Sequence, residues 1–183
     1  MMRLVKLGFV LCLLFIVSKG FAQVSFMHSG GLSLYSISSG VNSSVGPALM
    51  YSPRLNLVKL SDELTLSVGT HIGIDFFLSS NGNQNSSTFD IPLVAELNFG
   101  HGAIKQTKSK FGGFVGLGYG FTSIKTNASY EARGVLLNGG LRFVMFKKSF
   151  GLRVAYLLNS VKDVSDVSSF GLFYTFGYKP NLD

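Results

Sequence analysis

The sequence predicts an all-β protein, an eight-stranded antiparallel up-and-down transmembrane β-barrel with a side-chain-filled interior. Three observations support this fold class. Large apolar residues alternate with small or polar ones in eight separate segments, and a period of two indicates strands with two different faces. A secretory signal precedes these segments, and no stretch after it could span a membrane as a helix. Only helices and closed barrels satisfy every backbone polar group in lipid, so the barrel is the membrane fold that remains.

The start of the chain has the parts of a cleavable secretory signal peptide. Arg3 and Lys6 provide a basic start, an apolar run of 11 residues follows at 7–17, and small residues precede the expected cleavage point. Such a run is too short for a spanning helix, which needs about 20 residues, and a retained anchor is the alternative. We therefore expect residues 1–22 to be a cleaved signal peptide and residues 23–183 to form one outer-membrane β-barrel domain.

Composition narrows the function classes. Charged residues make up only 14% of the chain, while glycine (22) and phenylalanine (17) are abundant, which is unusual for a soluble domain. The one cysteine, Cys12, lies in the signal, so the mature chain has no disulfide framework. The signal also carries Arg3, Lys6 and Lys19, and its removal lowers the net charge from +7 to +4. Basic residues and aromatics do not gather on one face, so we expect no nucleic-acid partner.

Alternation and turn chemistry place the strands. They are expected at 26–38, 45–58, 63–78, 88–100, 111–125, 134–146, 150–161 and 169–179. In the first, Leu32 and Leu34 share one face while Tyr35 and Ile37 share the other, which predicts a phase slip or bulge. Proline removes a ladder donor, so the prolines inside expected strands should lie near strand ends or at bulges. They are Pro47, Pro53 and Pro92.

Alternation alone does not decide which face points outward. A soluble exported lipocalin-like ligand-binding barrel would bury the apolar face, whereas a membrane barrel turns it to lipid. The polar face here is rich in glycine and poor in lysine and glutamate, which suits a crowded interior better than a solvent surface. Aromatics also collect toward strand ends on the apolar face, as in interfacial girdles. We expect these aromatics to face lipid: Tyr51, Phe76, Phe89, Phe99, Tyr119, Phe121, Phe143, Tyr156, Tyr174, Phe176 and Tyr178.

Charged residues on the polar face form a predicted interior network. An arginine facing lipid near the membrane midplane would cost roughly 2–4 kcal/mol, whereas one facing inward can pair. The lumen of an eight-stranded barrel is just wide enough for side chains to fill it. We therefore expect a plugged, salt-bridged interior, with Asn138 as a hydrogen-bond partner, and not a pore. The members of the network are Arg54, His71, Asp75, Asp90, Glu96, Arg142 and Arg153.

Loop lengths give the barrel two different ends. Short links are expected at 61–63 and 147–149, and longer links rich in serine and asparagine at 79–87, 126–133 and 162–168. Short periplasmic turns and longer outer loops are usual for outer-membrane barrels. The link 101–110 is an exception, because it is long where a short turn is expected. The final strand ends in aromatics and must pair with the first strand to close the barrel.

Three stretches carry a likeness to a known family. They are the signal ending Phe21-Ala22-Gln23, the stretch 89–93 and the glycine-rich run 111–120. In these the chain resembles the PorT-like outer-membrane protein beta-barrel domain family, over nearly the whole mature chain. The resemblance implies an outer-membrane barrel of mostly unassigned activity; some members of the family serve protein secretion. It implies no particular functional residue.

Motifs for chemistry are few. Gly116, Gly118 and Gly120 have strand spacing and lack the strand-turn-helix setting of a phosphate loop. The histidines lie on different segments without metal-ligand spacing, so we expect no metal and no cofactor. His71 and Asp75 form the one acid–histidine pair, and we interpret it as an interior contact, not a catalytic one. We expect no catalytic residue and no enzyme.

The expected protein is exported across the inner membrane and resides in the outer membrane, with a structural or interaction role through its surface loops. Its partners would be outer-membrane lipid and, through the loops, envelope or secretion proteins, and we expect a monomer. Two alternatives stay open: an outer-membrane enzyme acting on lipid, and the soluble ligand-binding barrel.

Overall fold

The computed structural model describes residues 24–39, 42–78, 85–105, 107–125, 129–159 and 167–178. The expected signal peptide lies outside them. No helix within these residues is long and apolar enough to cross a membrane. The strands of the described residues are β1 (Ser25–Ser39), β2 (Asn42–Ser61), β3 (Leu64–Gly69), β4 (Ile72–Leu78), β5 (Asn85–Gly100), β6 (Phe111–Lys125), β7 (Ser129–Met145), β8 (Lys148–Asn159) and β9 (Val167–Phe176).

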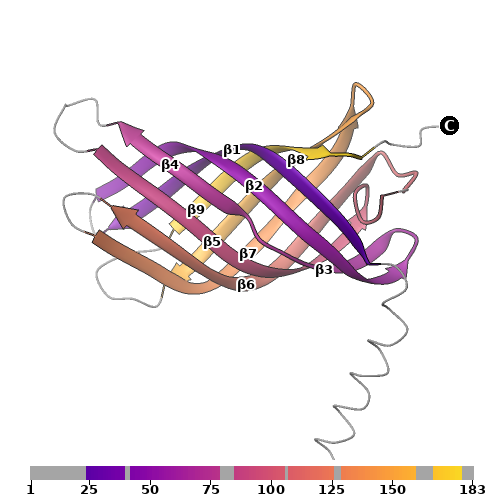
Figure 1. Cartoon of the computed structure of the whole chain (residues 1–183), viewed down its shortest axis with the longest axis horizontal. Coiled ribbons are helices and arrows are strands. Elements are labelled where there is room, and N and C mark those ends of the chain that lie inside the picture. The colour runs from indigo at the N-terminus through magenta and orange to yellow at the C-terminus, as the bar shows by residue number, and fades with distance from the viewer. Residues whose placement is uncertain are drawn as a thin grey trace, which may run out of the picture.

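The strands form one closed antiparallel ring (Figure 1). β3 and β4 together occupy one position between β2 and β5, so the nine strands make a ring of eight. β1 pairs with both β2 and β9, which closes the barrel. Neighbours in the ring follow one another in the chain, which is the up-and-down order. The predicted eight-stranded barrel is therefore confirmed, with its third strand split in two.

The split in the third strand lies at Thr70 and His71. Thr70 and His71 have no pairing partner in β2 or β5. Each of these neighbouring strands carries a proline beside the break, Pro53 in β2 and Pro92 in β5. A proline has no N–H for the ladder, and at this point the Pro53 carbonyl accepts the Thr70 N–H at 3.1 Å. Both prolines thus lie at an irregularity, as predicted, and the break lets His71 enter the interior.

The first strand is regular, so the predicted phase slip or bulge is wrong. β1 pairs along its whole length with β2 on one side, and over residues 28–37 with β9 on the other. Neither pairing has a shift in register. Tyr35 and Ile37 point inward, where they join a buried cluster with Val94, Leu136 and Leu157. The register shifts lie in β2 instead, opposite β3.

The wall of the barrel has an apolar outer face and a small or polar inner face. Leu93 of β5 is 65% exposed, for example, while its neighbours Pro92 and Val94 are fully buried. Inside, glycines leave space for large rings. A Cβ atom added to Gly151 would lie only 2.2 Å from the ring of Phe173, so this glycine is required for the ring to fill the lumen.

The chain order gives the barrel two distinct ends. The β2–β3, β5–β6 and β7–β8 connections lie at one end together with residues 24 and 178, and we call it the short-turn end (Figure 1). The longer links predicted for the opposite end, the long-loop end, fall mostly outside the described residues. β5 and β7 begin at Asn85 and Ser129, inside segments that were predicted to be loops.

Candidate functional site

A layer of charged side chains crosses the middle of the barrel. Arg54, Glu96, Arg142 and Arg153 project from inward positions of β2, β5, β7 and β8, and each is less than a tenth exposed. His71 reaches the same layer from the break between β3 and β4, and its side chain is also buried. The structure therefore brings together five of the seven residues of the predicted interior network.

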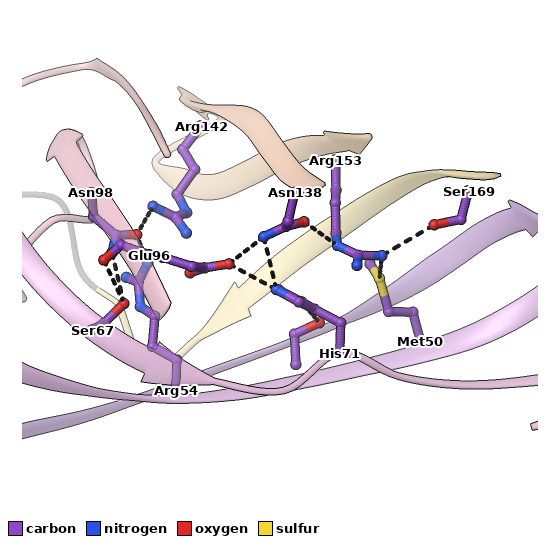
Figure 2. Close-up of polar contacts among 11 residues, drawn as sticks. Met50, Arg54, Ser67, His71, Glu96, Asn98, Asn138, Arg142, Arg153 and Ser169 are labelled. Carbon is purple, nitrogen blue, oxygen red and sulfur yellow. Dashed lines mark hydrogen bonds and ion pairs between the residues drawn. The ribbon is translucent and has the colours of Figure 1, made fainter. Parts of the chain in front are cut away.

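Glu96 is the centre of this layer (Figure 2). Its Oε1 lies 2.8 Å from His71 Nε2 and accepts a hydrogen bond from Asn138 Nδ2 at 2.5 Å. The other imidazole nitrogen of His71, Nδ1, lies 2.8 Å from Ser52 Oγ. The carboxylate is thus held by two side chains from opposite walls, and both ring nitrogens of His71 have partners.

The three arginines contact amides and other neutral groups in place of carboxylates. Arg153 donates from Nε to Asn138 Oδ1 at 2.7 Å, and Arg142 donates from Nη1 to Asn98 Oδ1 at 2.7 Å. Arg54 donates to the same oxygen of Asn98. The predicted salt bridges of the arginines need correction, because no arginine pairs with a carboxylate within the described contacts: Asn138 lies between Arg153 and Glu96, while Arg54 and Arg142 share the amide oxygen of Asn98. An amide can accept from a guanidinium and donate to a carboxylate at once, which lets Asn138 link Arg153 to Glu96.

Asp90 lies apart from this layer, toward the long-loop end. Its two carboxylate oxygens accept hydrogen bonds from Tyr35 at 2.9 Å and from Thr122 at 2.8 Å. The Tyr35 hydroxyl has room because it lies over Gly73, where a Cβ would be 2.2 Å from that oxygen. The backbone of Asp75 is part of β4, but its side chain lies outside the described part of the chain. Its predicted pairing with His71 is therefore outside what the structure describes.

The described residues of the link 101–110, which are 101–105 and 107–110, fold back into the mouth of the barrel at the short-turn end. His101 is fully buried, and its Nδ1 donates to the Ser109 carbonyl at 3.0 Å. With the proton on Nδ1, the other ring nitrogen accepts from the Ser149 hydroxyl at 2.8 Å. Burial lowers the pKa of His101. These contacts fasten the link to the start of β8, and we call it the end cap.

The end cap also contacts the charged layer. The Gly102 carbonyl accepts a hydrogen bond from the Arg54 guanidinium, and the Ala103 carbonyl accepts from Asn56 Nδ2 at 3.1 Å. Gly102 has a φ of 77° and lies against the Arg142 side chain, so no other residue would fit there without strain. The unexpected length of this link is thereby explained: a two-residue turn could not reach into the lumen.

Tyr178 is part of the same cap, so the prediction that it faces lipid is wrong. It is 5% exposed, its hydroxyl donates to the Thr107 carbonyl at 3.1 Å, and its ring meets the His101 ring edge-on at 4.6 Å. Burial raises the pKa of Tyr178. The alternation ends at Gly177, whose φ of 66° turns the chain inward across the mouth.

A continuous row of rings surrounds much of the short-turn end on the outside. It crosses β7, β8, β9, β1 and β2, and its successive ring centroids are 5.1–6.4 Å apart. We call it the aromatic belt, and its members are Phe143, Phe150, Tyr174, Phe176, His28 and Tyr51. Phe143 and Tyr174 are half-buried because their neighbours in the belt cover them. His28 was not singled out in the sequence, although its outward position in β1 could have indicated it.

The other aromatics predicted to face lipid lie on the outer wall wherever their side chains are described. The exposed ones outside the belt are Phe89, Phe99, Tyr119, Phe121 and Tyr156. The side chain of Phe76 lies outside the described part of the chain.

Ser52, His71 and Glu96 have the connectivity of a catalytic triad. Both contacts of the imidazole are 2.8 Å long, within the range of a nucleophile, a base and an orienting acid. The cavity beside them measures about 20 Å³, which is room for about one water molecule. Among the described side chains, no group of histidines, cysteines and carboxylates could hold a metal ion. Ser52 and Asn98 were not predicted as members of the interior network, because many inward positions of this sequence are polar and nothing distinguishes these two.

Comparison with known proteins shows what this barrel is similar to. No protein-family model matches the sequence, and no curated protein matches it. Among solved structures, the attachment invasion locus protein Ail of Yersinia pestis has a TM-score of 0.59 at 13% identity, covering 82% of this chain and 97% of Ail. Neisserial surface protein A has a TM-score of 0.53 at 17% identity, covering 84% of this chain and 96% of that protein. At such low identity the likeness shows a shared fold, the small closed β-barrel.

Proposed function

We propose that this chain is a small integral outer-membrane β-barrel protein with a structural or interaction role through its surface loops, and that it is not an open pore. The observation that carries this proposal is the combination of an apolar outer wall with a polar, filled and capped interior. Export by a cleaved signal peptide is part of the same proposal and rests on the basic start and apolar run at the beginning of the chain.

The height of the apolar wall supports a membrane location. Phe143, in the aromatic belt, and Arg133 lie ten positions apart on outward-facing sites of β7, and the outward residues between them are apolar or glycine. Ten residues of strand span about 33 Å, which is about 25 Å along the axis of a barrel whose strands tilt by about 40°. This matches the apolar band of outer-membrane barrels, which is also about 25 Å tall.

The same wall argues against a soluble ligand-binding barrel. That fold would expose charged side chains and enclose an apolar cavity. Here Leu49, Leu93 and Phe111 are each more than 60% exposed, and the three arginines of the charged layer lie inside. Fractionation with a heat-modifiability gel tests the location. We expect the protein in the membrane fraction, with a mobility that shifts on boiling; recovery in the aqueous fraction without detergent would contradict the proposal.

The interior supports a closed barrel. The charged layer leaves a cavity of about 20 Å³, and the end cap fills the mouth at the short-turn end. We expect no stable channels in a planar lipid bilayer, and long-lived openings of uniform conductance would contradict this part of the proposal.

A lipid-modifying enzyme is the second candidate, and the Ser52–His71–Glu96 connectivity is the observation that favours it. Against it stands the size of the adjoining cavity, which holds about one water molecule and no acyl group. Incubation of the refolded protein with a fluorophosphonate probe tests the serine directly, with His71→Ala as the matched variant. We expect no labelling of Ser52 in either protein; labelling that is lost in His71→Ala would favour the enzyme.

The resemblance to the PorT-like family supports envelope or secretion proteins as partners of the loops. The aromatic belt and the apolar wall support outer-membrane lipid as the other partner. The protein is proposed to act as a monomer without a cofactor.

A further inference from the structure

A groove of about 170 Å³ lies on the outer wall of the barrel, over β5, β6 and β7. Two rows of side chains form it. Phe89, Ser123 and Glu131 lie opposite one another in the first row, and Ile91, Phe121 and Arg133 in the second. Ser123 is small and has a bulky residue on each side, so the hollow lies over it, and Phe121 closes the hollow toward the middle of the wall.

The two sides of the groove differ in chemistry. The β5 side is apolar, formed by Phe89 and Ile91, which are both more than 40% exposed. The β7 side carries Glu131 and Arg133, which are also exposed. An apolar side next to a charged side suits a molecule that has both an acyl chain and a charged headgroup.

The groove lies where a lipid headgroup would be. Arg133 is about 25 Å along the barrel axis from the aromatic belt, so it marks the opposite edge of the apolar wall, at the long-loop end. Glu131 is two residues further toward that end, or roughly 6–7 Å along the strand. A membrane lipid entering from the surrounding bilayer would therefore meet Arg133 first and Glu131 further out.

We propose that this groove binds the headgroup of a membrane lipid, with its phosphate at Arg133 and a hydroxyl or ammonium donor of the same headgroup at Glu131. A guanidinium matches a phosphate with two parallel hydrogen bonds, and a carboxylate and a serine hydroxyl can accept from the outer donor. The inference rests on the outer-membrane location proposed above. It goes further, because it assigns one part of the wall to one lipid chemistry.

A pair of lipids that differ only in N-methylation tests this chemistry. Phosphatidylethanolamine has N–H donors beyond its phosphate, and phosphatidylcholine has none. The mature chain has no cysteine of its own once Cys12 leaves with the signal, so Val135→Cys next to the groove can carry a single fluorophore. The labelled protein is placed in phosphatidylcholine vesicles that contain a small fraction of either lipid bearing a nitroxide on its acyl chain.

We expect quenching by the ethanolamine lipid to show an apparent affinity up to about fivefold higher than that of the choline lipid, the factor for one hydrogen bond of about 1 kcal/mol. A fluorophore at Leu49→Cys, on the exposed wall of β2, should show no preference. Glu131→Gln should reduce the preference to parity, and Arg133→Gln should weaken the binding of both lipids. Ser123→Phe should also reach parity, because it fills the hollow without changing any charge.

Equal quenching by both lipids at Val135→Cys in the otherwise unchanged protein would overturn the inference. So would a preference that survives Ser123→Phe in protein with a normal heat-shifted mobility, because the preference would then not depend on the hollow. Inorganic phosphate is added in a separate arm, and loss of the preference there would show a site for the free ion and overturn the assignment to lipid. Failure to enter vesicles at all would contradict the proposed location, which separates the two claims.

Discussion

Replacing Asn138 with alanine should destabilise the barrel by about 3–5 kcal/mol. The amide oxygen of Asn138 accepts from Arg153 Nε at 2.7 Å, and its nitrogen donates to Glu96 Oε1 at 2.5 Å. Both partners are 1% exposed, so neither can turn to water when the amide is removed. A hydrogen bond to a charged group contributes about 1.5–3 kcal/mol, and removing one partner of a buried charge costs about 3–5 kcal/mol.

The free energy of unfolding in phospholipid vesicles measures this effect. Guanidinium titrations can be followed by the loss of the heat-shifted gel band and by circular dichroism, and the shift in midpoint gives the destabilisation. Ser33→Ala is a matched control, because it deletes a buried hydroxyl for which no hydrogen-bond partner is described, and it should change stability by less than about 0.5 kcal/mol.

A double-mutant cycle shows whether the effect acts through Glu96. Glu96→Gln combined with Asn138→Ala should be less destabilising than the sum of the single variants, by about 0.5–3 kcal/mol, because the two side chains share one hydrogen bond. A loss below about 1 kcal/mol for Asn138→Ala, or strict additivity in the cycle, would refute the reasoning that the amide links the charges.

Three further predictions concern other parts of the barrel. Gly151→Leu should cost about 1–3 kcal/mol in the same titration, because its Cβ would lie 2.2 Å from the Phe173 ring, whereas Gly139→Ala should cost much less, since its Cβ meets no atom closer than 3.4 Å. Burial lowers the pKa of His101 in the folded cap below its ordinary value near 6.5. At a pH between the folded and the ordinary pKa, the unfolded cap binds more protons than the folded one, so the cap loses stability as pH falls. The protection factors of the amides in 101–105, which correct for the slower intrinsic exchange at low pH, should therefore fall on acidification, and this fall should vanish in His101→Gln. Phe146 and Lys147 both have positive φ, 52° and 58°, in the two-residue β7–β8 turn, so Asn-Gly at these positions should slow unfolding and stabilise the barrel by about 1–3 kcal/mol.

Period-two alternation was enough to place the wall of this barrel. A residue that belongs on the outer face repeats at every second position whatever its distant neighbours are, so Leu93 and Leu117 could be assigned to one face from local sequence alone. The inward position of Arg54, Glu96, Arg142 and Arg153 followed from the same rule. The partner of each charge did not follow, because a partner depends on which strands lie across the lumen.

The errors of prediction arose where the chain leaves the alternation for a tertiary reason. Tyr35 is large and apolar but lies inside, because Gly73 on another strand makes room for its hydroxyl. Tyr178 continues the pattern of the last strand in sequence, yet the positive φ of Gly177 directs it into the end cap. The sequence of one strand shows neither the room that a glycine on another strand leaves in the lumen nor the direction in which the chain turns after the strand ends.

The sequence by itself determined the class of this protein: the strands, their two faces, their number and the apolar wall, since each depends on local periodicity and composition. Only the tertiary structure decided that β1 closes against β9, that the Asn138 amide links Arg153 to Glu96, and that the link 101–110 caps one end. The reason is physical: closure, hydrogen-bond pairing across a lumen and the filling of a mouth depend on distances between residues far apart in the chain.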